Sequence, residues 1–348
     1  MSHQYERPVA QDGLRLHLNE NTAGCSPNVA RVLGELTREH AALYPDYELA
    51  IDAAARHFGI SRDNLVLTNG LDDGIMLAAL VTLRGAPAID PYEAIVVQPA
   101  FDMYAACVEA MGGRIVDVLP QQDFFFPLQR LQQALTARTR IIFLTNPNNP
   151  TGLSIPRSSV AAVAAAAPQA LIFLDEAYAD FSGQTMVSDA ATGRIPNLVV
   201  GRTFAKAFGL AGLRVGALVS SAAMLAPIRR AVLPYTLNAF AAAALPAAIN
   251  DREYYEWYLE EVRESKRLLY DTLARAGVRF WPRDGNFVLA CFGDDLARVV
   301  AGLAGRGINI RDRSRDPGCA GCARITAGVL DHTRRLIAAL EEVLCGAR

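Results

Sequence analysis

The chain has 348 residues and a formal net charge of −2, with neither a basic excess nor an acidic tail. This balance excludes a strongly basic nucleic-acid-binding surface and a solvating acidic segment. About half of the residues (51%) are hydrophobic and 20% are charged, as in ordinary globular proteins. The length predicts one large and one smaller domain, or a single large α/β unit.

The chain begins without the apolar core of a signal peptide. Its longest apolar stretches, residues 160–167 and 239–249, are too short to span a bilayer. We therefore expect a cytoplasmic protein with no membrane and no nucleic-acid partner, in which the six cysteines are reduced thiols. Cys319 and Cys322 have the spacing of half a zinc site or a redox pair, but a second ligand pair is missing, so we interpret this segment as a loop without a metal.

Short apolar runs alternate with helical patterns from residue 50 to about residue 220. Most of these runs are apolar throughout, which is typical of strands buried on both faces. Helix-like stretches such as residues 72–83 and 158–166 lie between them. This alternation predicts a largely parallel sheet covered by helices. The seven expected strands are residues 65–68, 95–97, 115–119, 141–145, 171–175, 198–201 and 216–220.

A second, smaller α+β domain is predicted after about residue 245. It would consist of a long charged helix closed by Gly277, three strands and two further helices. The first 45 residues are interpreted as irregular and proline-containing. We therefore predict a large domain over residues 46–245, with residues 1–45 and 246–348 forming the small domain. The predicted elements of the small domain are helices at residues 253–276, 296–306 and 333–344, and strands at residues 286–292, 308–311 and 323–327.

Two loops at strand ends carry donors for a ligand. Thr68-Asn-Gly-Leu-Asp-Asp-Gly74 follows a strand and opens a helix, so the amides from Gly70 to Asp72 predict an anion site. A plain strand–glycine–helix turn explains this segment equally well. Asn146-Pro-Asn-Asn-Pro-Thr-Gly152 also follows a strand, and Asn149 can present an amide donor there.

Two further motifs carry charged side chains. Asp175, in Leu174-Asp-Glu-Ala-Tyr178, could hold a protonated ring nitrogen; the alternative is a solvated helix cap. Lys206 lies among small and apolar residues, where a lysine suits Schiff-base chemistry, although it could also be a surface lysine. Arg214 follows eight residues later, and two cations on one loop indicate an anion between them.

Together these motifs resemble the fold-type I aminotransferases that depend on pyridoxal 5'-phosphate (PLP), and the resemblance covers nearly the whole chain. It implies a large α/β domain with a mostly parallel, mixed seven-stranded sheet flanked by helices, plus a smaller α+β domain. It also implies that Lys206 binds PLP as a Schiff base and that Asp175 pairs with the pyridine nitrogen. The other residues that the resemblance assigns to the cofactor are Asn149 and Tyr178 at the ring 3-oxygen, Gly70, Leu71, Asp72, Thr203 and Arg214 at the phosphate, and Phe101 on the ring face, with Tyr104 as its substitute.

The chain departs from this family immediately before the lysine. The family usually has Ser or Thr there, whose hydroxyl contacts the cofactor phosphate, and this chain has Ala205. A missing charge-assisted hydrogen bond costs about 1.5–3 kcal/mol, so we expect weaker cofactor binding.

The ends of the chain resemble the histidinol-phosphate aminotransferase subfamily. The matching segments are Asn19-Glu-Asn21, Tyr44-Pro-Asp46, residues 307–312 and residues 322–328, with Arg311 and Arg324 13 positions apart. The resemblance implies that these arginines bind the substrate phosphate or carboxylate, since a guanidinium can hold either in a bidentate manner. It assigns Asn21 and Tyr5 to the substrate, and Tyr44 to the neighbouring subunit's site in a homodimer. An interdomain ion-pair role for Arg311 and Arg324 is the alternative.

The implied reaction is the transfer of an amino group from histidinol phosphate to 2-oxoglutarate, which yields imidazole-acetol phosphate and glutamate. Lys206 and Tyr178 would act with Asp175 as the catalytic residues, and the kinetics would be ping-pong. The alternatives are an aromatic amino-acid aminotransferase, a threonine-phosphate decarboxylase and, from another class, a non-catalytic PLP-binding protein. A nucleotide-binding protein is disfavoured because no phosphate-loop lysine accompanies the glycines at residues 70–74.

Overall fold

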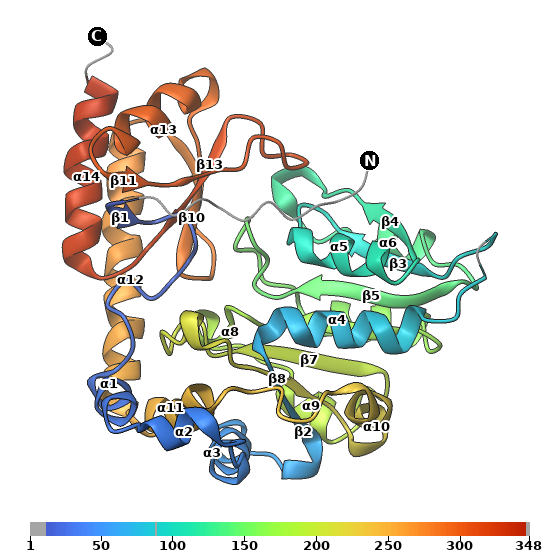
Figure 1. Cartoon of the computed structure of the whole chain (residues 1–348). Helices are drawn as coiled ribbons and strands as arrows, with labels where there is room; N and C mark the ends of the chain where they lie inside the picture. The colour runs from blue at the N-terminus through green and yellow to red at the C-terminus, as the bar shows by residue number, and fades with distance from the viewer. Residues whose placement is uncertain (1–11, 88, 346–348) are drawn as a thin grey trace.

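The computed structural model describes residues 12–87 and 89–345. Figure 1 shows a large body built on one sheet and a smaller body above it at the left, with the long helix α12 (Arg252–Arg275) running beside both. Within the described residues, no helix is long and apolar enough to cross a membrane.

The large sheet has seven strands in the order β2-β8-β7-β6-β5-β3-β4. β8 pairs antiparallel with both of its neighbours, and the remaining pairs are parallel. Each strand matches a predicted run within two residues at either end, so the predicted mostly parallel, mixed sheet is confirmed. The strands are β2 (Leu65–Thr68), β3 (Glu93–Val97), β4 (Arg114–Val118), β5 (Thr139–Thr145), β6 (Leu171–Asp175), β7 (Leu198–Thr203) and β8 (Gly216–Val219).

Helices cover both faces of this sheet. α4 (Gly70–Leu83), α5 (Asp102–Ala110) and α10 (Ala222–Ala231) bury one apolar face, where Ile75, Val108 and Ile228 are fully buried. The opposite face packs against the other large-body helices, as expected for strands that are apolar on both sides. These are α3 (Glu48–Phe58), α6 (Leu128–Gln133), α7 (Arg157–Ala166), α8 (Ala179–Ser182), α9 (Val187–Ala191) and α11 (Ala239–Asn250).

The small body contains a four-stranded antiparallel sheet in the order β12-β13-β10-β9. α12 and two further helices close its core, in which Leu269, Val299 and Leu340 are fully buried. Its remaining elements are β9 (Arg279–Trp281), β10 (Phe287–Cys291), β12 (Arg311–Asp312), β13 (Cys322–Thr326), α13 (Leu296–Ala304) and α14 (Leu330–Cys345). Single turns of 3-10 helix, η1 (Arg62–Asn64), η2 (Gln122–Phe124), η3 (Ala211–Leu213) and η4 (Gly293–Asp295), lie in the connections of both bodies.

The N-terminal segment is more regular than predicted. β1 (Leu14–Arg15) pairs in parallel with β11 (Ile308–Asn309), so the single strand expected at residues 308–311 is two short strands in different sheets. α1 (Pro27–Gly34) and α2 (Arg38–Ala42) follow, and the interpretation of the first 45 residues as irregular was wrong. Ser26 caps α1 through its side chain, with Pro27 in the first turn, which is a helix-start signal readable from the sequence.

The same segment contributes to both cores. Leu14 and Leu16 lie in the core of the small body, whereas Val29 on α1 lies in the core of the large one. The division into residues 46–245 and the remainder stays a prediction. Cys319 and Cys322 are buried free thiols that pack against Phe124, and no cluster of potential metal ligands is found among residues 12–87 and 89–345.

Candidate active site

A pocket of about 370 Å³ opens where the carboxyl ends of β2, β5, β6 and β7 face the small body. Ligand sites of open α/β sheets lie at such strand ends. The pocket brings together residues that are far apart in the sequence. Those predicted from the sequence that line it are Leu71, Asp72, Phe101, Asn149, Asp175, Tyr178, Thr203, Lys206, Arg214, Arg311 and Arg324.

The first turn of α4 forms one wall with Arg214. Gly70 has φ of 77°, and a Cβ there would lie 2.5 Å from Arg214 Nη2. A Cβ on Gly216 would lie 2.6 Å from the carbonyl carbon of Gly70 and 2.7 Å from the amide nitrogen of Leu71. These two glycines therefore let the guanidinium and β8 approach the helix N-terminus, where amides and the helix dipole favour an anion. Arg214 donates to the Asp72 carboxylate at 2.7 Å, which the sequence did not indicate.

Asp175 ends β6 and is only 4% exposed. Its Oδ2 accepts a hydrogen bond from the Tyr104 hydroxyl at 2.6 Å, and its Oδ1 accepts one from the Ala177 amide at 2.9 Å. Burial raises the pKa of Asp175 to about 6, although these two bonds oppose the rise. Tyr104 therefore orients Asp175 and does not itself line the pocket, whereas Phe101 does. The Thr145 hydroxyl lies 2.8 Å from the Tyr104 hydroxyl and completes this chain.

Asn149 and Arg324 fix each other's orientation. Arg324 Nη1 donates to Asn149 Oδ1 at 2.5 Å, and Arg324 Nη2 donates to the His17 carbonyl at 2.6 Å. A guanidinium is only a donor, so the amide oxygen must face it, and Asn149 Nδ2 remains a donor for the pocket. Each terminal nitrogen of Arg324 thus donates one hydrogen bond within the protein, and the expected bidentate contact with a substrate stays a prediction. Its buried Nε has no hydrogen-bond partner among the described residues.

A second chain of hydrogen bonds reaches Tyr178. Thr326 Oγ1 donates to Asn19 Oδ1 at 3.1 Å, and Asn19 Nδ2 donates to the Tyr178 hydroxyl oxygen at 3.0 Å. The Tyr178 hydroxyl proton is therefore available to an acceptor in the pocket. Lys206 Nζ lies 5.9 Å from the centre of the Tyr178 ring and donates to the Leu18 carbonyl at 3.1 Å.

The small-body wall is strongly basic. Three arginines and one histidine line the pocket there: Arg311, Arg313, Arg324 and His17. Arg313 and His17 were not singled out from the sequence. Burial lowers the pKa of His17, and the nearby guanidiniums lower it further. Burial likewise lowers the pKa of Arg324 to about 10, helped by Arg313 and Arg311. A convergence of cations of this kind favours an anionic ligand.

Several predicted residues are not brought into this pocket. Asn21 instead donates to the Ala207 carbonyl at 3.0 Å and accepts from the Ala23 amide at 2.9 Å, so it braces the segment after Lys206. Tyr44 is 77% exposed and stacks on Tyr235, with ring centres 4.0 Å apart. Gly70 supports the pocket without lining it, and Tyr5 lies outside the described residues.

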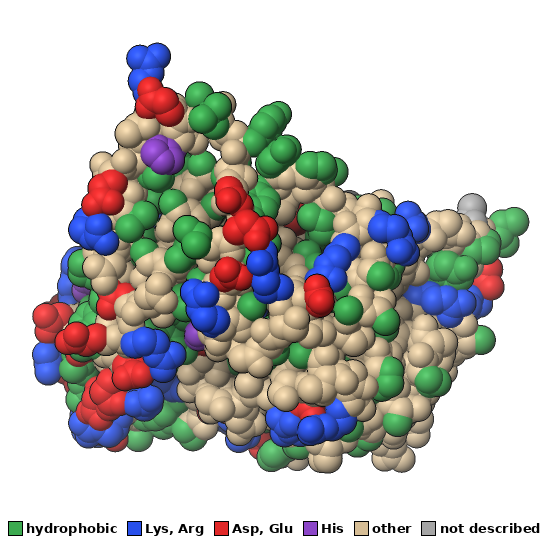
Figure 2. All heavy atoms as spheres, turned by 90° about the horizontal axis from the view of Figure 1, so that it is seen from below, with side chains coloured by type: hydrophobic (Ala, Val, Ile, Leu, Met, Phe, Trp, Pro, Cys, Tyr) green, Lys and Arg blue, Asp and Glu red, His purple; other side chains and the backbone are tan. Residues whose placement is uncertain are grey.

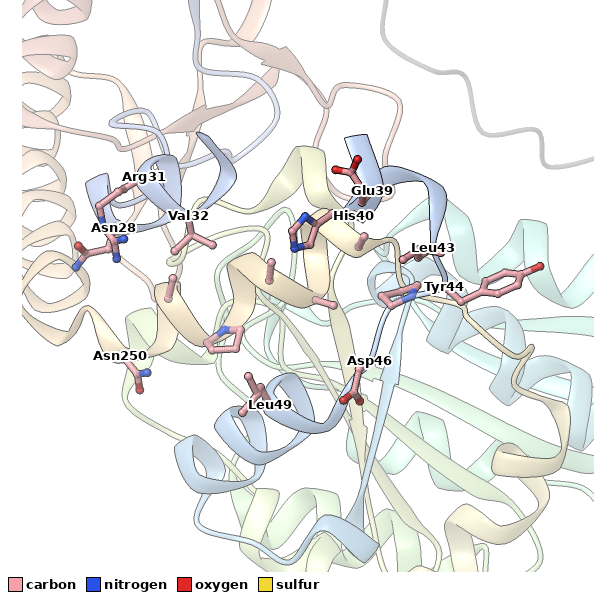
Figure 3. A pocket seen from close by; sticks show the side chains of 16 residues that line it. Asn28, Arg31, Val32, Glu39, His40, Leu43, Tyr44, Asp46, Leu49 and Asn250 are labelled. Carbon is pink, nitrogen blue, oxygen red and sulfur yellow. The ribbon is translucent and has the colours of Figure 1, made fainter. Parts of the chain in front are cut away.

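A larger groove of about 770 Å³ lies elsewhere, along α1, α2, α3 and α11. Figure 3 shows Leu43 and Tyr44 where the chain leaves α2, and Leu49 on α3. None of the motifs at the strand ends contributes to this groove. We therefore place the chemistry in the smaller pocket, which contains the buried aspartate, the lysine and the guanidiniums.

A family model described as aminotransferase class I and II matches residues 11–340. The chain belongs to this family. Among similar aminotransferases, histidinol-phosphate aminotransferase 2 of Ralstonia nicotianae is 36% identical over 342 residues, which are 96% of this chain and 89% of that protein. The histidinol-phosphate aminotransferase of Methanosarcina barkeri is 34% identical over 336 residues, or 94% of this chain and 88% of that one.

Solved structures support the same aminotransferase fold. The histidinol-phosphate aminotransferase of Sinorhizobium meliloti in complex with pyridoxal-5'-phosphate has a TM-score of 0.86 at 26% identity, covering 97% of this chain and 92% of that one. A Thermus thermophilus aspartate aminotransferase with maleate has a TM-score of 0.77 at 20% identity, covering 96% and 92% respectively. The predicted fold class, a fold-type I PLP transferase with a large α/β part and a smaller α+β part, is confirmed.

Proposed function

We propose that this chain is a PLP-dependent aminotransferase that transfers the amino group of histidinol phosphate to 2-oxoglutarate. The observation that carries the proposal is the meeting of Lys206, Asp175 and a wall of arginines in one pocket. The first two suit PLP chemistry, and the arginines suit an anionic substrate. The names of relatives that are 32–36% identical over nearly the whole chain supply the identity of the amino donor.

The pocket fits the cofactor at each end. The amides at the start of α4, with Arg214 and Thr203, would hold the phosphate, and the space left by Gly70 and Gly216 allows that approach. Phe101 would face the ring. When bound, PLP supplies an electron sink that weakens the C–H bond beside the substrate nitrogen.

Asp175 would bind the pyridine nitrogen and hold a proton on it. The Asp175 carboxylate is buried, and burial raises its pKa to about 6. A cationic partner would therefore stabilise its charged form. Tyr104 and the Ala177 amide keep the carboxylate oriented. Asn149 Nδ2 and the Tyr178 hydroxyl each present a donor to the pocket, and both would bind the ring oxygen.

Lys206 Nζ would accept the proton from the substrate carbon that carries the amino group and return it to the aldehyde carbon of the cofactor. Its present bond to the Leu18 carbonyl, at 3.1 Å, gives it a resting position within the pocket. The substrate anion would lie against Arg311 and Arg324, which keeps the reacting carbon near Lys206.

We also propose a homodimer in which Tyr44 contributes to the partner's pocket. Leu43, Tyr44 and Leu49 are 69%, 77% and 76% exposed, which is unusual for large apolar side chains that lie together along one groove. Figure 2 views the molecule from this side, where hydrophobic side chains lie exposed between groups of charged ones. A second copy covering the groove would bury them.

The proposal is tested by single half-reactions of the purified protein. Histidinol phosphate alone should convert the absorbance of the bound cofactor to that of its amine form, and 2-oxoglutarate should reverse the change. Lys206→Ala should show no conversion. Phosphothreonine and phenylalanine serve as parallel donors: carbon dioxide release from phosphothreonine would identify a decarboxylase, and conversion by phenylalanine alone would identify an aromatic aminotransferase.

A further inference from the structure

Arg313 is a third guanidinium in the pocket, beside the two predicted from the sequence. It follows β12, is only 8% exposed and lines the same wall as Arg311 and Arg324. Its backbone amide donates to the Cys322 carbonyl at 2.9 Å, which ties it to the strand that carries Arg324. Neither the proposed reaction nor the family motifs use this side chain.

The donors of Arg313 are only partly occupied. Its Nε faces Asp316 Oδ2 in an ion pair. In the part of the chain that the structure describes, no hydrogen bond or ion pair engages its two terminal nitrogens. A guanidinium has five N–H donors in one plane, so Asp316 can hold one edge of the group while the other edge serves a ligand. Asp316 thus orients Arg313 without saturating it.

The neighbouring arginine has fewer donors left for an anion. Arg324 already donates one hydrogen bond from each terminal nitrogen within the protein, and its buried Nε has no partner among residues 12–87 and 89–345. An anion in this corner would therefore gain hydrogen bonds from more than one guanidinium. A planar carboxylate presents two oxygens in one plane, whereas a phosphate monoester presents three that point in different directions. Donors on Arg311, Arg313 and Arg324 match the second shape.

The charges around this corner favour an anion. Glu20 is paired with Arg15, and Asp316 with Arg313. Asp102, at the start of α5 across the pocket, is the remaining carboxylate near the wall. Guanidiniums therefore exceed carboxylates here, and a phosphate monoester carries about −1.5 to −2 charges at neutral pH against −1 for a carboxylate.

We propose that Arg313 is a specificity residue that makes the pocket prefer an amino donor with a phosphate monoester over one with a carboxylate. The inference rests on the proposed function, since it concerns the substrate of the same reaction. Removing one charge-assisted donor should reduce the preference about 10- to 100-fold.

The kinetic test compares two amino donors, histidinol phosphate and glutamate, in half-reactions of the holoenzyme. We expect Arg313→Met to lower the ratio of their second-order rate constants at least about 10-fold. Arg313→Lys keeps the charge but loses the planar set of guanidinium donors, so the ratio should fall less than in Arg313→Met. Arg315→Met removes an equal charge from an exposed position on the same loop and should leave the ratio unchanged. A ratio that stays constant in both Arg313 variants overturns the proposal, even if overall activity falls.

A binding test separates this inference from the proposed function. Calorimetric titration of the holoenzyme with glycerol 3-phosphate and with glutarate requires no turnover. We expect Arg313→Met to weaken the binding of glycerol 3-phosphate at least about 10-fold more than the binding of glutarate. Arg313→Met/Asp316→Asn avoids leaving a buried unpaired carboxylate and provides a second variant if the first does not fold. Equal losses for both ligands, or no binding of glycerol 3-phosphate by the unaltered protein, overturn the inference. Failure of the unaltered protein to react with histidinol phosphate would instead count against the proposed function.

Discussion

At the scale of single residues, Asp175 shows how a binding-site residue can lower the stability of the protein without its ligand. Burial raises the pKa of Asp175 from 3.8 to about 6, which corresponds to about 3 kcal/mol. For a group whose folded pKa is raised, the stability is fully present below the unfolded pKa and is lost as the pH rises through the folded value. The cofactor-free protein therefore loses stability through this residue between about pH 4 and pH 6.

We accordingly predict that Asp175→Asn changes the pH dependence of the cofactor-free protein. The difference in free energy of unfolding, variant minus unaltered protein, should increase by about 2 kcal/mol between about pH 4.5 and pH 7.5, because the variant has no buried carboxylate to ionise. Urea unfolding of both proteins at the two pH values measures this difference. The same difference at both values would contradict the raised pKa. In the half-reaction with cofactor, the variant should be severely impaired because the ring nitrogen loses its anionic partner.

Ala205 gives a prediction in which a substitution improves cofactor binding. It lines the pocket and is 7% exposed, while its amide donates to the Thr203 hydroxyl oxygen at 3.2 Å. A hydroxyl at this position would add a donor for the cofactor phosphate. We predict that Ala205→Ser tightens cofactor binding about 10-fold. Equilibrium titration of cofactor-free protein checks this, with Ala205→Val as a control for side-chain size; equal affinity of Ala205→Ser and the unaltered protein would show that the existing anchors already satisfy the phosphate.

Residue identities were predictable where a motif carries them, but their hydrogen bonds were not. The strand-end motifs indicated Asn149, Asp175 and Lys206, and the structure brings all three into one pocket. By contrast, the use of both Arg324 terminal nitrogens depends on residues 17 and 149, far away in the sequence. No local pattern encodes such pairings, because they arise only when distant segments of the chain pack together.

At the scale of elements, the junction of α4 and β8 depends on the absence of a side chain. A Cβ on Gly216 would meet the backbone of Gly70 and Leu71 at 2.6–2.8 Å, and backbone cannot move aside as a flexible side chain can. The first turn of α4 would have to shift away from β8. The amides that face the pocket would shift with it.

We therefore predict that Gly216→Ala weakens cofactor binding more than about 10-fold and lowers the free energy of unfolding by about 1–3 kcal/mol. Gly34→Ala is the matched control, since a Cβ there meets nothing within 4 Å and its backbone is helical. Cofactor titration and chemical unfolding measure the two effects. Retention of cofactor affinity in Gly216→Ala would show that the helix start is not the phosphate site.

The loop at residues 146–152 shows a similar constraint between the two bodies. Gly152 has φ of 72°, and a Cβ there would lie 2.5 Å from the Asp284 carbonyl oxygen. The Asp284 amide donates to the Gly152 carbonyl at 3.0 Å, and the Ser154 hydroxyl donates to the Asp284 carboxylate at 2.5 Å. The small body thus holds the loop that carries Asn149. The sequence showed this glycine within a motif but not its partner.

Strands of the large sheet were predictable because they are buried on both faces. All five residues of β6 are buried, so its apolar run is continuous. β1 and β11 have two residues each and are defined by pairing across nearly the whole chain, which leaves no local periodicity. The start of α1 did have a local signal in the sequence, the Ser26 cap followed by Pro27. This helix was therefore predictable, although the segment was interpreted as irregular.

At the scale of the whole molecule, the proposed homodimer gives Tyr44 a role in the reaction that it lacks within one chain. Within one chain it lies on the groove of α1, α2, α3 and α11, not in the pocket that contains Lys206. If Tyr44 serves the partner's pocket, every active site combines residues of two chains. A chain lacking Tyr44 then disables its partner's site and leaves its own intact.

Mixing two inactive variants decides this arrangement. Lys206→Ala supplies Tyr44 but has no lysine, and Tyr44→Ala supplies the lysine. After unfolding and refolding an equal mixture, half of the dimers should be hybrids with one complete site each, which restores about a quarter of the original sites. Half-reaction amplitude with histidinol phosphate measures this fraction, and each variant refolded alone is the control. If Tyr44 acts within its own chain, every site keeps one lesion and the mixture remains as inactive as its components, because no exchange of subunits can then assemble a lysine and a tyrosine around one pocket.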